Sequence, residues 1–440
     1  MSHGPGQSRK NTIGIMAKDL FESTITLTDA ARMTGPQAFN IMIKAGGSLC
    51  NLDCRYCYYL DKAFLYGGKE PRMSEEMLET VIKKYIEACD VPEVTFNWHG
   101  GEPLVMGLDF YRKAVELENK YADGKTVHNT LQTNGTLLTP QWAEFFAENR
   151  FLIGLSIDGP EHIHDRYRSS KAGEPSFDKV MAGLRVLVRG GVEFNTLTAL
   201  SKASEGHGLE IYQFLKSVGS RYMQFLPVVE KIVYRKNDKG KAVKSERPSV
   251  VSPSDDANDG IGSWSISGTG YGRFLCDIFD YWVRNDVGRY FVGIFDATLA
   301  SLCGEMPGTC SFAETCGNNF VVEHNGDVYV CDHFVYPEYK LGNVVSDSFK
   351  DMAASDRAVS FGINKRNSLP GQCRRCEWRT LCNGECPQHR FDRTETGAKG
   401  LNSLCAGLKM FYRHTYPYMQ KMRELLQQEL PPADIMLMVK

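Results

Sequence analysis

The sequence lacks several features that mark common classes of protein. No run of 18 or more apolar residues occurs, so we expect no membrane-spanning helix and no membrane partner. The first residues, Met1 to Lys10, are polar and lack the apolar stretch of a secretory signal, which favours a cytoplasmic protein. Positive and negative side chains nearly balance, with a net charge of -2, and this argues against a nucleic-acid partner.

Cysteine is absent from residues 90–275, although the chain contains 14 cysteines. Most of them gather in two places, near residue 54 and between residues 303 and 405. A secreted disulfide scaffold would be short and rich in cysteine throughout. The clustering therefore indicates metal ligation in a reducing compartment.

Between residues 38 and 230, apolar β-rich runs alternate with amphipathic, helix-like segments. Six strands separated by helices imply parallel βαβ units, and so an α/β fold. Such a series closes into a full or partial barrel or opens into a doubly wound sheet, with ligands at the C-terminal strand ends. The strands are expected at Phe39–Lys44, Val94–Trp98, Val127–Gln132, Phe151–Ile157, Phe194–Leu200 and Tyr222–Val229.

Composition also divides the chain into parts. Residues 236–269 are rich in Lys, Ser, Asp and Gly, which predicts a mobile insertion. Loops dense in Cys and Gly replace the alternating pattern after about residue 300. We expect an N-terminal extension over 1–37, a first domain over 38–300, a cysteine-rich domain over 301–425 and a tail over 426–440.

Cys50, Cys54 and Cys57 form a C-x3-C-x2-C motif directly after the first predicted strand. Three thiolates can hold three irons of a [4Fe–4S] cluster and leave the fourth iron open to S-adenosylmethionine. A zinc site would require a fourth ligand nearby, and the nearest histidine, His99, follows another strand. The spacing, the place of the motif and Tyr56 before its last cysteine resemble the radical S-adenosylmethionine (radical SAM) superfamily. The resemblance implies a partial (β/α)6 TIM-like barrel with the cluster at its top.

The same resemblance implies which residues bind S-adenosylmethionine. Gly101 and Glu102 belong to a Gly-Gly-Glu-Pro sequence after the second strand, which in the superfamily meets the amino group of the cofactor. Ser156 ends the fourth strand, and Arg168 could pair with a carboxylate through two donors. Taken singly, these two residues more often have structural roles. Leu226, in the sixth strand, is a candidate to pack on the adenine, and Tyr56 completes the set.

Eight further cysteines lie between residues 310 and 405. Eight thiolates are enough for two fully ligated four-iron clusters, although a pair of zinc ribbons is the alternative. The run resembles a SPASM domain, including Gly326 in the segment before Cys331. The resemblance implies interleaved ligands, with Cys310, Cys316, Cys331 and Cys386 on auxiliary cluster I and Cys373, Cys376, Cys382 and Cys405 on auxiliary cluster II. The chain would then hold three [4Fe–4S] clusters.

Three cysteines and three histidines outside these motifs carry predictions of their own. We expect Cys89, Cys276 and Cys303 to be small core residues. His162 and His164 are expected to be exposed in a polar loop. His389, near Cys386, is expected to contact its own loop.

From about residue 38 to 425 the sequence resembles the anaerobic sulfatase-maturating enzymes. The matching features are Tyr58-Tyr59 after the first triad, Gly-Gly-Glu-Pro, Ser-Ile-Asp-Gly-Pro at 156–160, and the eight-cysteine pattern followed at one point by Asp332. The resemblance implies oxidation of a Cys or Ser in an unfolded sulfatase segment to Cα-formylglycine. Asp332 would act as the base, and a reduced flavodoxin or ferredoxin-type protein would donate electrons.

Two other functions fit parts of the pattern. A SPASM-type peptide maturase that forms thioether or other cross-links would share the clusters, but many such enzymes carry a winged-helix leader-binding domain, and residues 1–37 are too short for one. A non-enzymatic scaffold would bind two or three zinc ions and no iron. Iron content and a peptide assay distinguish these alternatives.

Overall fold

The computed structural model describes residues 24–28, 39–66, 71–232, 235–236, 242–243 and 260–439. Its centre is a curved sheet in the order β12-β11-β10-β1-β2-β3-β4-β5-β6-β9. The strands from β1 to β6 are parallel and follow one another in sequence order, which confirms the partial (β/α)6 barrel. Their bounds are Asn40–Lys44, Glu93–Trp98, Thr126–Thr133, Leu152–Ser156, Phe194–Leu200 and Tyr222–Pro227.

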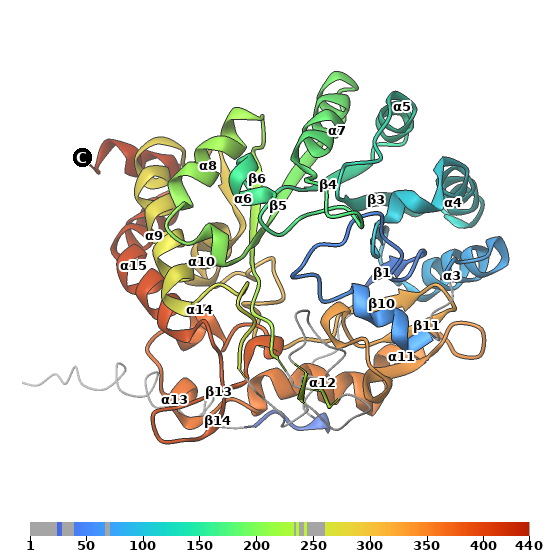
Figure 1. Cartoon of the computed structure of the whole chain (residues 1–440). Helices are drawn as coiled ribbons and strands as arrows, with labels where there is room; N and C mark the ends of the chain where they lie inside the picture. The colour runs from blue at the N-terminus through green and yellow to red at the C-terminus, as the bar shows by residue number, and fades with distance from the viewer. Residues whose placement is uncertain are drawn as a thin grey trace, which may run out of the picture.

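Helices between these strands cover the outer face of the sheet, and the inner face is concave (Figure 1). In β2 the side chains of Val94, Phe96 and Trp98 are buried in alternation with less buried neighbours, as expected for a strand with two different faces. The covering helices are α3 (Glu75–Ala88), α4 (Leu108–Tyr121), α5 (Pro140–Glu148), α6 (Glu161–His164), α7 (Phe177–Arg189) and α8 (Gly208–Ser217).

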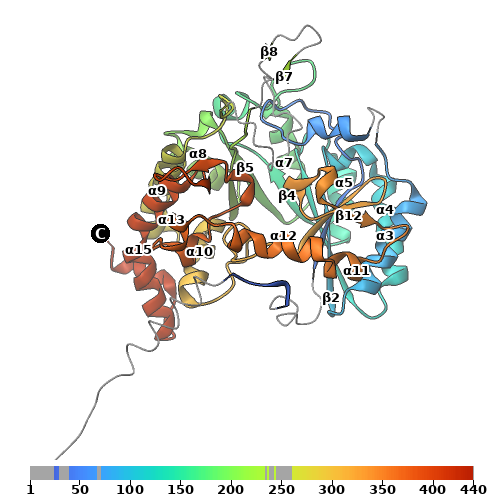
Figure 2. The same cartoon turned by 90° about the horizontal axis from the view of Figure 1, so that it is seen from below.

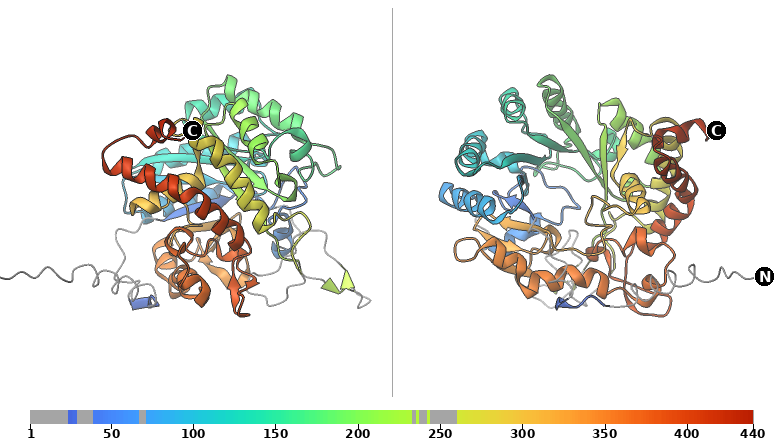
Figure 3. Two further views of the ribbon diagram at one scale, coloured as in Figure 1. Left: turned by 90° about the vertical axis from the view of Figure 1, so that its left-hand side faces the viewer. Right: turned by 180° about the vertical axis from the view of Figure 1, so that it is seen from behind.

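Three further helices follow the barrel strands and pack as a group beside β6. They are α9 (Gly268–Asn285), α10 (Gly293–Cys303) and α15 (Cys405–Gln427), with β9 (Phe291–Val292) before α10. Helices α9 and α15 lie side by side (Figure 3). They approach so closely that a Cβ on Gly407 would lie 1.8 Å from the carbonyl oxygen of Gly268, so glycine is required at this crossing.

The cysteine-rich region begins by extending the barrel sheet. Strand β10 (Asn319–Glu323) pairs in parallel with β1, and β11 (Asp327–Tyr329) and β12 (Lys340–Asn343) follow as antiparallel strands. Short helices then cross the open side of the barrel toward α15 (Figures 1 and 2). They are α11 (Phe349–Ala354), α12 (Asp356–Asn367), α13 (Gly371–Arg374) and α14 (Arg379–Cys382), followed by the pair β13 (Asp392–Arg393) and β14 (Lys399–Leu401).

One of the expected segments differs from the prediction where the structure describes it. The predicted insertion 236–269 ends too late, because Trp264 and Ile266 are buried. Most of its earlier part lies outside the described residues, apart from the small hairpin β7 (Arg235–Lys236) and β8 (Ala242–Val243). The predicted C-terminal tail packs on the molecule through Ile435, which is buried. The domain boundary near residue 300 stays a prediction. Among the described helices, none combines the length and apolarity that a bilayer crossing requires.

Candidate active site

The first three cysteines lie together in the loop that follows β1. The thiols of Cys50, Cys54 and Cys57 are close together, because Cys54 and Cys57 raise the pKa of Cys50 and Cys57 raises the pKa of Cys54. Burial is the largest cause and raises the pKa of both Cys50 and Cys54 to about 12, while the positive charge of Arg168 opposes the shift at Cys54. Three clustered thiols beside one buried cation fit a metal centre with three protein ligands.

Backbone amides point at several of these sulfur atoms. The amide of Leu52 donates to Cys50 Sγ at 3.4 Å, and the amide of Tyr59 donates to Cys57. The same arrangement, with the donor two residues after the cysteine, recurs at Cys331 and at two further C-terminal cysteines, Cys382 and Cys386. Such N–H···S bonds stabilise thiolates and are among the features that tune iron–sulfur clusters.

The Gly-Gly-Glu sequence after β2 contacts the loop that carries Cys50. The amide of Gly101 donates to Gly47, and a Cβ on Gly101 would lie 2.3 Å from the Leu49 carbonyl oxygen. Glu102 is buried, and its carboxylate accepts hydrogen bonds from the amides of Leu104 and Asn134 and from the Thr133 hydroxyl. Burial raises its pKa to about 7. Close packing thus explains the glycine and fixes the carboxylate beside the cysteine loop.

Two of the other predicted cofactor residues converge on Asp158, two residues after β4. The Tyr56 hydroxyl donates to Asp158 Oδ2 at 2.5 Å, and Arg168 Nε donates to the same oxygen at 2.9 Å. Ser156 accepts a hydrogen bond from Gln132 at 2.9 Å. The side chain of Leu226 on β6 is 48% exposed, so it is available to pack against a bound molecule. Asp158 therefore holds Tyr56 and Arg168 together, a role that was not predicted for it.

The eight C-terminal cysteines fall into two groups by proximity. Cys310 and Cys316 lie close enough to Cys331 to raise its pKa, and Cys331 and Cys316 raise the pKa of Cys386 in the same way. In the other group, Cys405 raises the pKa of Cys373 and of Cys382. Cys376 in turn raises the pKa of Cys405. These neighbours match the predicted ligand sets, in which Cys386 joins the earlier cysteines. All 14 cysteines are free thiols, as metal ligation requires.

Buried cations accompany the first of these groups. Lys365 is 1% exposed, and its ammonium bonds the carbonyl oxygens of Cys310 and Ser311 at 2.5 and 2.8 Å. Its charge opposes the rise that burial causes in the pKa of Cys310 and Cys316. Arg390 donates to four backbone carbonyls, including those of Gly384 and Glu385. Positive charge and fixed loops fit a site that gathers four thiolates.

Asp332 lies between the first triad and the first C-terminal group. Its carboxylate pairs with Lys44 Nζ at 2.5 Å and accepts a hydrogen bond from the Tyr58 hydroxyl. Burial alone would raise the pKa of Asp332. The charge of Lys44 and, to a smaller extent, that of His99 outweigh this effect and hold the pKa well below its usual range. Tyr58 directly follows Cys57 in the chain, and Asp332 directly follows Cys331. The hydrogen bond between Tyr58 and Asp332 therefore connects the segments that carry the two cysteine groups.

The surroundings of Asp332 were not predicted from the sequence. Lys44 is fully buried at the end of β1 and lies 4.0 Å from the centre of the Tyr59 ring and 3.3 Å from His99 Nδ1. The Tyr59 hydroxyl donates to the buried carboxylate of Glu323, the residue opposite Lys44 on β10. Lys44 ends a largely apolar strand, and this position was the one sequence feature that could have indicated a buried lysine.

Two predictions for single residues differ from the structure, and the others agree with it. Cys89 is buried and Cys276 packs partly against the core, but the prediction for Cys303 is wrong because Cys303 is exposed at the end of α10. His164 is also not exposed as predicted; its Nδ1 accepts a hydrogen bond from the amide of Asp158. His162 is exposed as expected, and His389 bonds Glu385 in its own loop.

Comparison with known proteins agrees with this geometry. Residues 46–215 match the radical SAM superfamily, and residues 310–377 match the SPASM iron–sulfur cluster-binding domain. The chain is 47% identical over 402 residues to a serine-type anaerobic sulfatase-maturating enzyme of Bacteroides thetaiotaomicron, covering 91% of this chain and 95% of that protein. It is 33% identical to a cysteine-type anaerobic sulfatase-maturating enzyme of Clostridium novyi, covering 86% and 95%.

Solved structures give the same relationship. The structure described as native anSMEcpe with bound AdoMet matches with a TM-score of 0.75 and 29% identity, covering 88% of this chain and 99% of that one. A second structure of anSMEcpe contains AdoMet and a bound peptide and matches equally well. The chain therefore belongs to the anaerobic sulfatase-maturating enzymes, radical SAM enzymes with a C-terminal iron–sulfur domain.

Proposed function

We propose that this enzyme oxidises a serine or cysteine side chain in an unfolded sulfatase segment to Cα-formylglycine, with Asp332 as the base. The observation that carries the proposal is the hydrogen bond from Tyr58 to Asp332, because their sequence neighbours Cys57 and Cys331 belong to two different cysteine groups. A carboxylate held between the two cysteine groups supports the role of a base for a substrate side chain that reacts there.

The residues that would hold the cofactors are those already described. Cys50, Cys54 and Cys57 would bind the cluster that S-adenosylmethionine completes, with Tyr56, Gly101, Glu102, Ser156, Arg168 and Leu226 around the cofactor. The two C-terminal groups would bind auxiliary clusters I and II. When bound, S-adenosylmethionine and its cluster would supply a 5′-deoxyadenosyl radical for hydrogen abstraction from the substrate Cβ, and the auxiliary clusters would supply a path for the remaining electron.

The protein's own contribution to the reaction is a group that accepts a proton. Lys44 keeps Asp332 ionised, so the carboxylate can accept the proton of a substrate hydroxyl or thiol. Loss of one hydrogen atom, one proton and one electron converts a serine side chain to an aldehyde. A cysteine would give a thioaldehyde, which water converts to the aldehyde.

Serine is the better supported substrate residue, because identity to the serine-type relative exceeds identity to the cysteine-type relative. We also propose a reduced flavodoxin or ferredoxin-type electron donor and a cytoplasmic location. The low potential needed to reduce a four-iron cluster supports the donor. The oxygen sensitivity expected of partly exposed clusters supports a reducing compartment.

The test is anaerobic incubation with two sulfatase-derived peptides that differ only in Ser or Cys at the target position. We expect an aldehyde product in mass spectra, with faster conversion of the Ser peptide. The absence of aldehyde from both peptides, while S-adenosylmethionine is still cleaved, would contradict the proposed substrate.

A further inference from the structure

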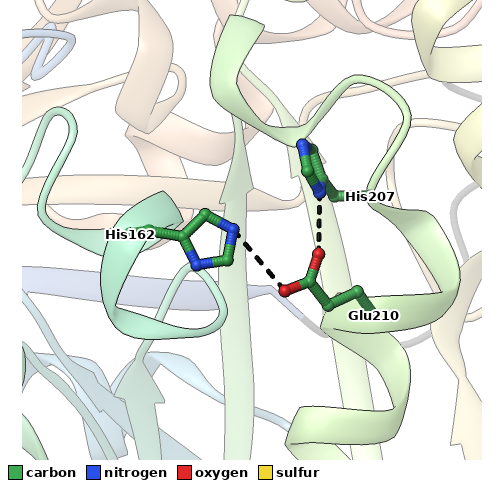
Figure 4. Close-up of side chains that lie close together, drawn as sticks. All are labelled: His162, His207 and Glu210. Carbon is green, nitrogen blue, oxygen red and sulfur yellow. Dashed lines mark hydrogen bonds and ion pairs between the residues drawn. The ribbon is translucent and has the colours of Figure 1, made fainter.

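A group of side chains that contains no cysteine could also hold a metal ion. His162 on α6 faces His207 and Glu210 at the start of α8 (Figure 4). One ligand atom from each of the three side chains lies within 4.8 Å of the others. The Glu210 carboxylate sits between the two imidazoles, 2.7 Å from His207 Nδ1 and 3.5 Å from His162 Nε2.

The chemistry of these ligands selects a class of ion. Two imidazoles and one carboxylate are a frequent zinc ligand set, whereas Mg²⁺ and Ca²⁺ prefer oxygen ligands alone. Ligand atoms around a tetrahedral Zn²⁺ lie about 3.3 Å apart, since Zn–N distances are about 2.0–2.1 Å. All three side chains are between 42% and 59% exposed, so small rotations can close the remaining gap. The fourth position would face solvent.

The backbone already holds the ligands in register. His207 and Glu210 are three residues apart at the start of one helix, so their side chains share a face. The N-terminus of α8 is positively polarised and would by itself disfavour a cation. The negative charge of Glu210, in the first turn of this helix, offsets that effect. Gly159, just before α6, packs against the buried Ile211 of α8, where a Cβ would lie only 2.9 Å from the Ile211 side chain.

We propose that His162, His207 and Glu210 bind one Zn²⁺ ion, or a divalent ion of similar ligand preference. The ion would join α6 to α8 and so tie together the segments that follow β4 and β5. Asp158 lies at the base of the first segment and already accepts a hydrogen bond from Ala199 in β5 at 3.0 Å. Zinc would thus stiffen the rim that carries Asp158 without taking part in the reaction.

The test uses the iron-loaded enzyme under nitrogen, with Zn²⁺ alone as the probe. After equilibrium dialysis, zinc and iron are counted for the wild type, His162→Ala, Glu210→Gln and the control His128→Ala, which removes an exposed histidine from β3. We expect wild type and His128→Ala to hold one more zinc per chain than the other two variants, at equal iron content. Zinc should also raise the melting temperature of wild type by about 3 °C at saturation, and that of His162→Ala not at all.

Equal zinc content in wild type, His162→Ala and Glu210→Gln would overturn the proposal and leave the three side chains as a hydrogen-bonded group. Equal iron content and unchanged S-adenosylmethionine cleavage show that each variant is folded. Loss of iron on adding zinc would mean that the ion binds cysteines, and this outcome also counts against the site.

Discussion

Lys44 and Asp332 form an ion pair of 2.5 Å at the junction of the barrel and the cysteine-rich region. Lys44 ends β1, and Asp332 follows the hairpin of β10 and β11. The pair exists because β10 lies next to β1 in parallel register, with Glu323 opposite Lys44. The proposed base is thus held by the strand that leads to the first cysteine motif.

Replacing Asp332 by Asn should separate cofactor cleavage from substrate oxidation. We expect Asp332→Asn to cleave S-adenosylmethionine at a rate near that of wild type, and to form aldehyde about 10²–10⁴-fold more slowly, because the amide cannot accept the proton. The measurement is the ratio of 5′-deoxyadenosine to aldehyde, with the exposed Asp109→Asn as control. Unimpaired aldehyde formation would remove Asp332 from its role.

Replacing Lys44 by Met should make aldehyde formation depend on pH. Without the ammonium, the pKa of Asp332 rises, so a fraction of the carboxyl becomes protonated as the pH falls, and the rate should increase between about pH 6 and pH 8. In wild type the carboxylate is ionised throughout this range. Lys44→Arg keeps the charge and should restore a flat profile. Breaking the buried pair should also cost about 3–5 kcal/mol of stability.

The buried imidazole of His164 should make stability fall in mild acid. Burial lowers its pKa to about 4, against about 6.5 in the unfolded chain, so the unfolded state binds the proton more readily between these values. The stabilisation is complete above pH 6.5 and lost as the pH falls toward 4, about 1.4 kcal/mol per pH unit. Urea unfolding at about pH 7 and 5.5 should show a smaller difference for His164→Gln than for wild type. The exposed His128→Gln should behave as wild type.

The crossing of α9 and α15 should not tolerate a methyl group. Gly407→Ala would place a Cβ 1.8 Å from the Gly268 carbonyl oxygen, and backbone cannot move aside as a side chain can. We expect a loss of roughly 1–3 kcal/mol, despite the better helix propensity of Ala. Gly293→Ala in α10 is the matched control, since its nearest neighbouring atom would be at 3.8 Å. Equal melting temperatures would contradict the close packing seen here.

Interleaving of the C-terminal cysteines can be tested by comparing single variants. If Cys316 and Cys386 share a cluster, replacing either by Ala should remove the same signal from the electron paramagnetic resonance spectrum and about four irons per chain. Cys405→Ala should remove a different signal. Cys303→Ala, at an exposed and unassigned cysteine, should retain full iron. Different signals lost from the first two variants would break the assigned grouping.

Much of the fold could be predicted because local patterns specify it. The six barrel strands lie within two residues of their expected positions, since apolar β-rich runs and amphipathic segments report burial directly. The insertion was placed wrongly at its end, because Trp264 sits in a polar stretch yet is buried by distant parts of the chain. His164 was misjudged because its polar neighbours Glu161 and His162 are exposed, whereas its own side chain points inward to Asp158.

The sequence by itself determined the chemistry: three closely spaced thiolates can hold a cluster with one open iron, eight further thiolates are enough for two more clusters, and the residues after the parallel strands must gather at one end of a barrel. Only the tertiary structure decided how Asp332 is held, with Lys44 and Tyr58 brought to it from segments far away in the chain. It also brought His162 to His207 and Glu210. Spacing along the chain constrains only nearby residues, whereas ion pairs and ligand sets between distant segments depend on strand order and register, which packing of the whole core determines.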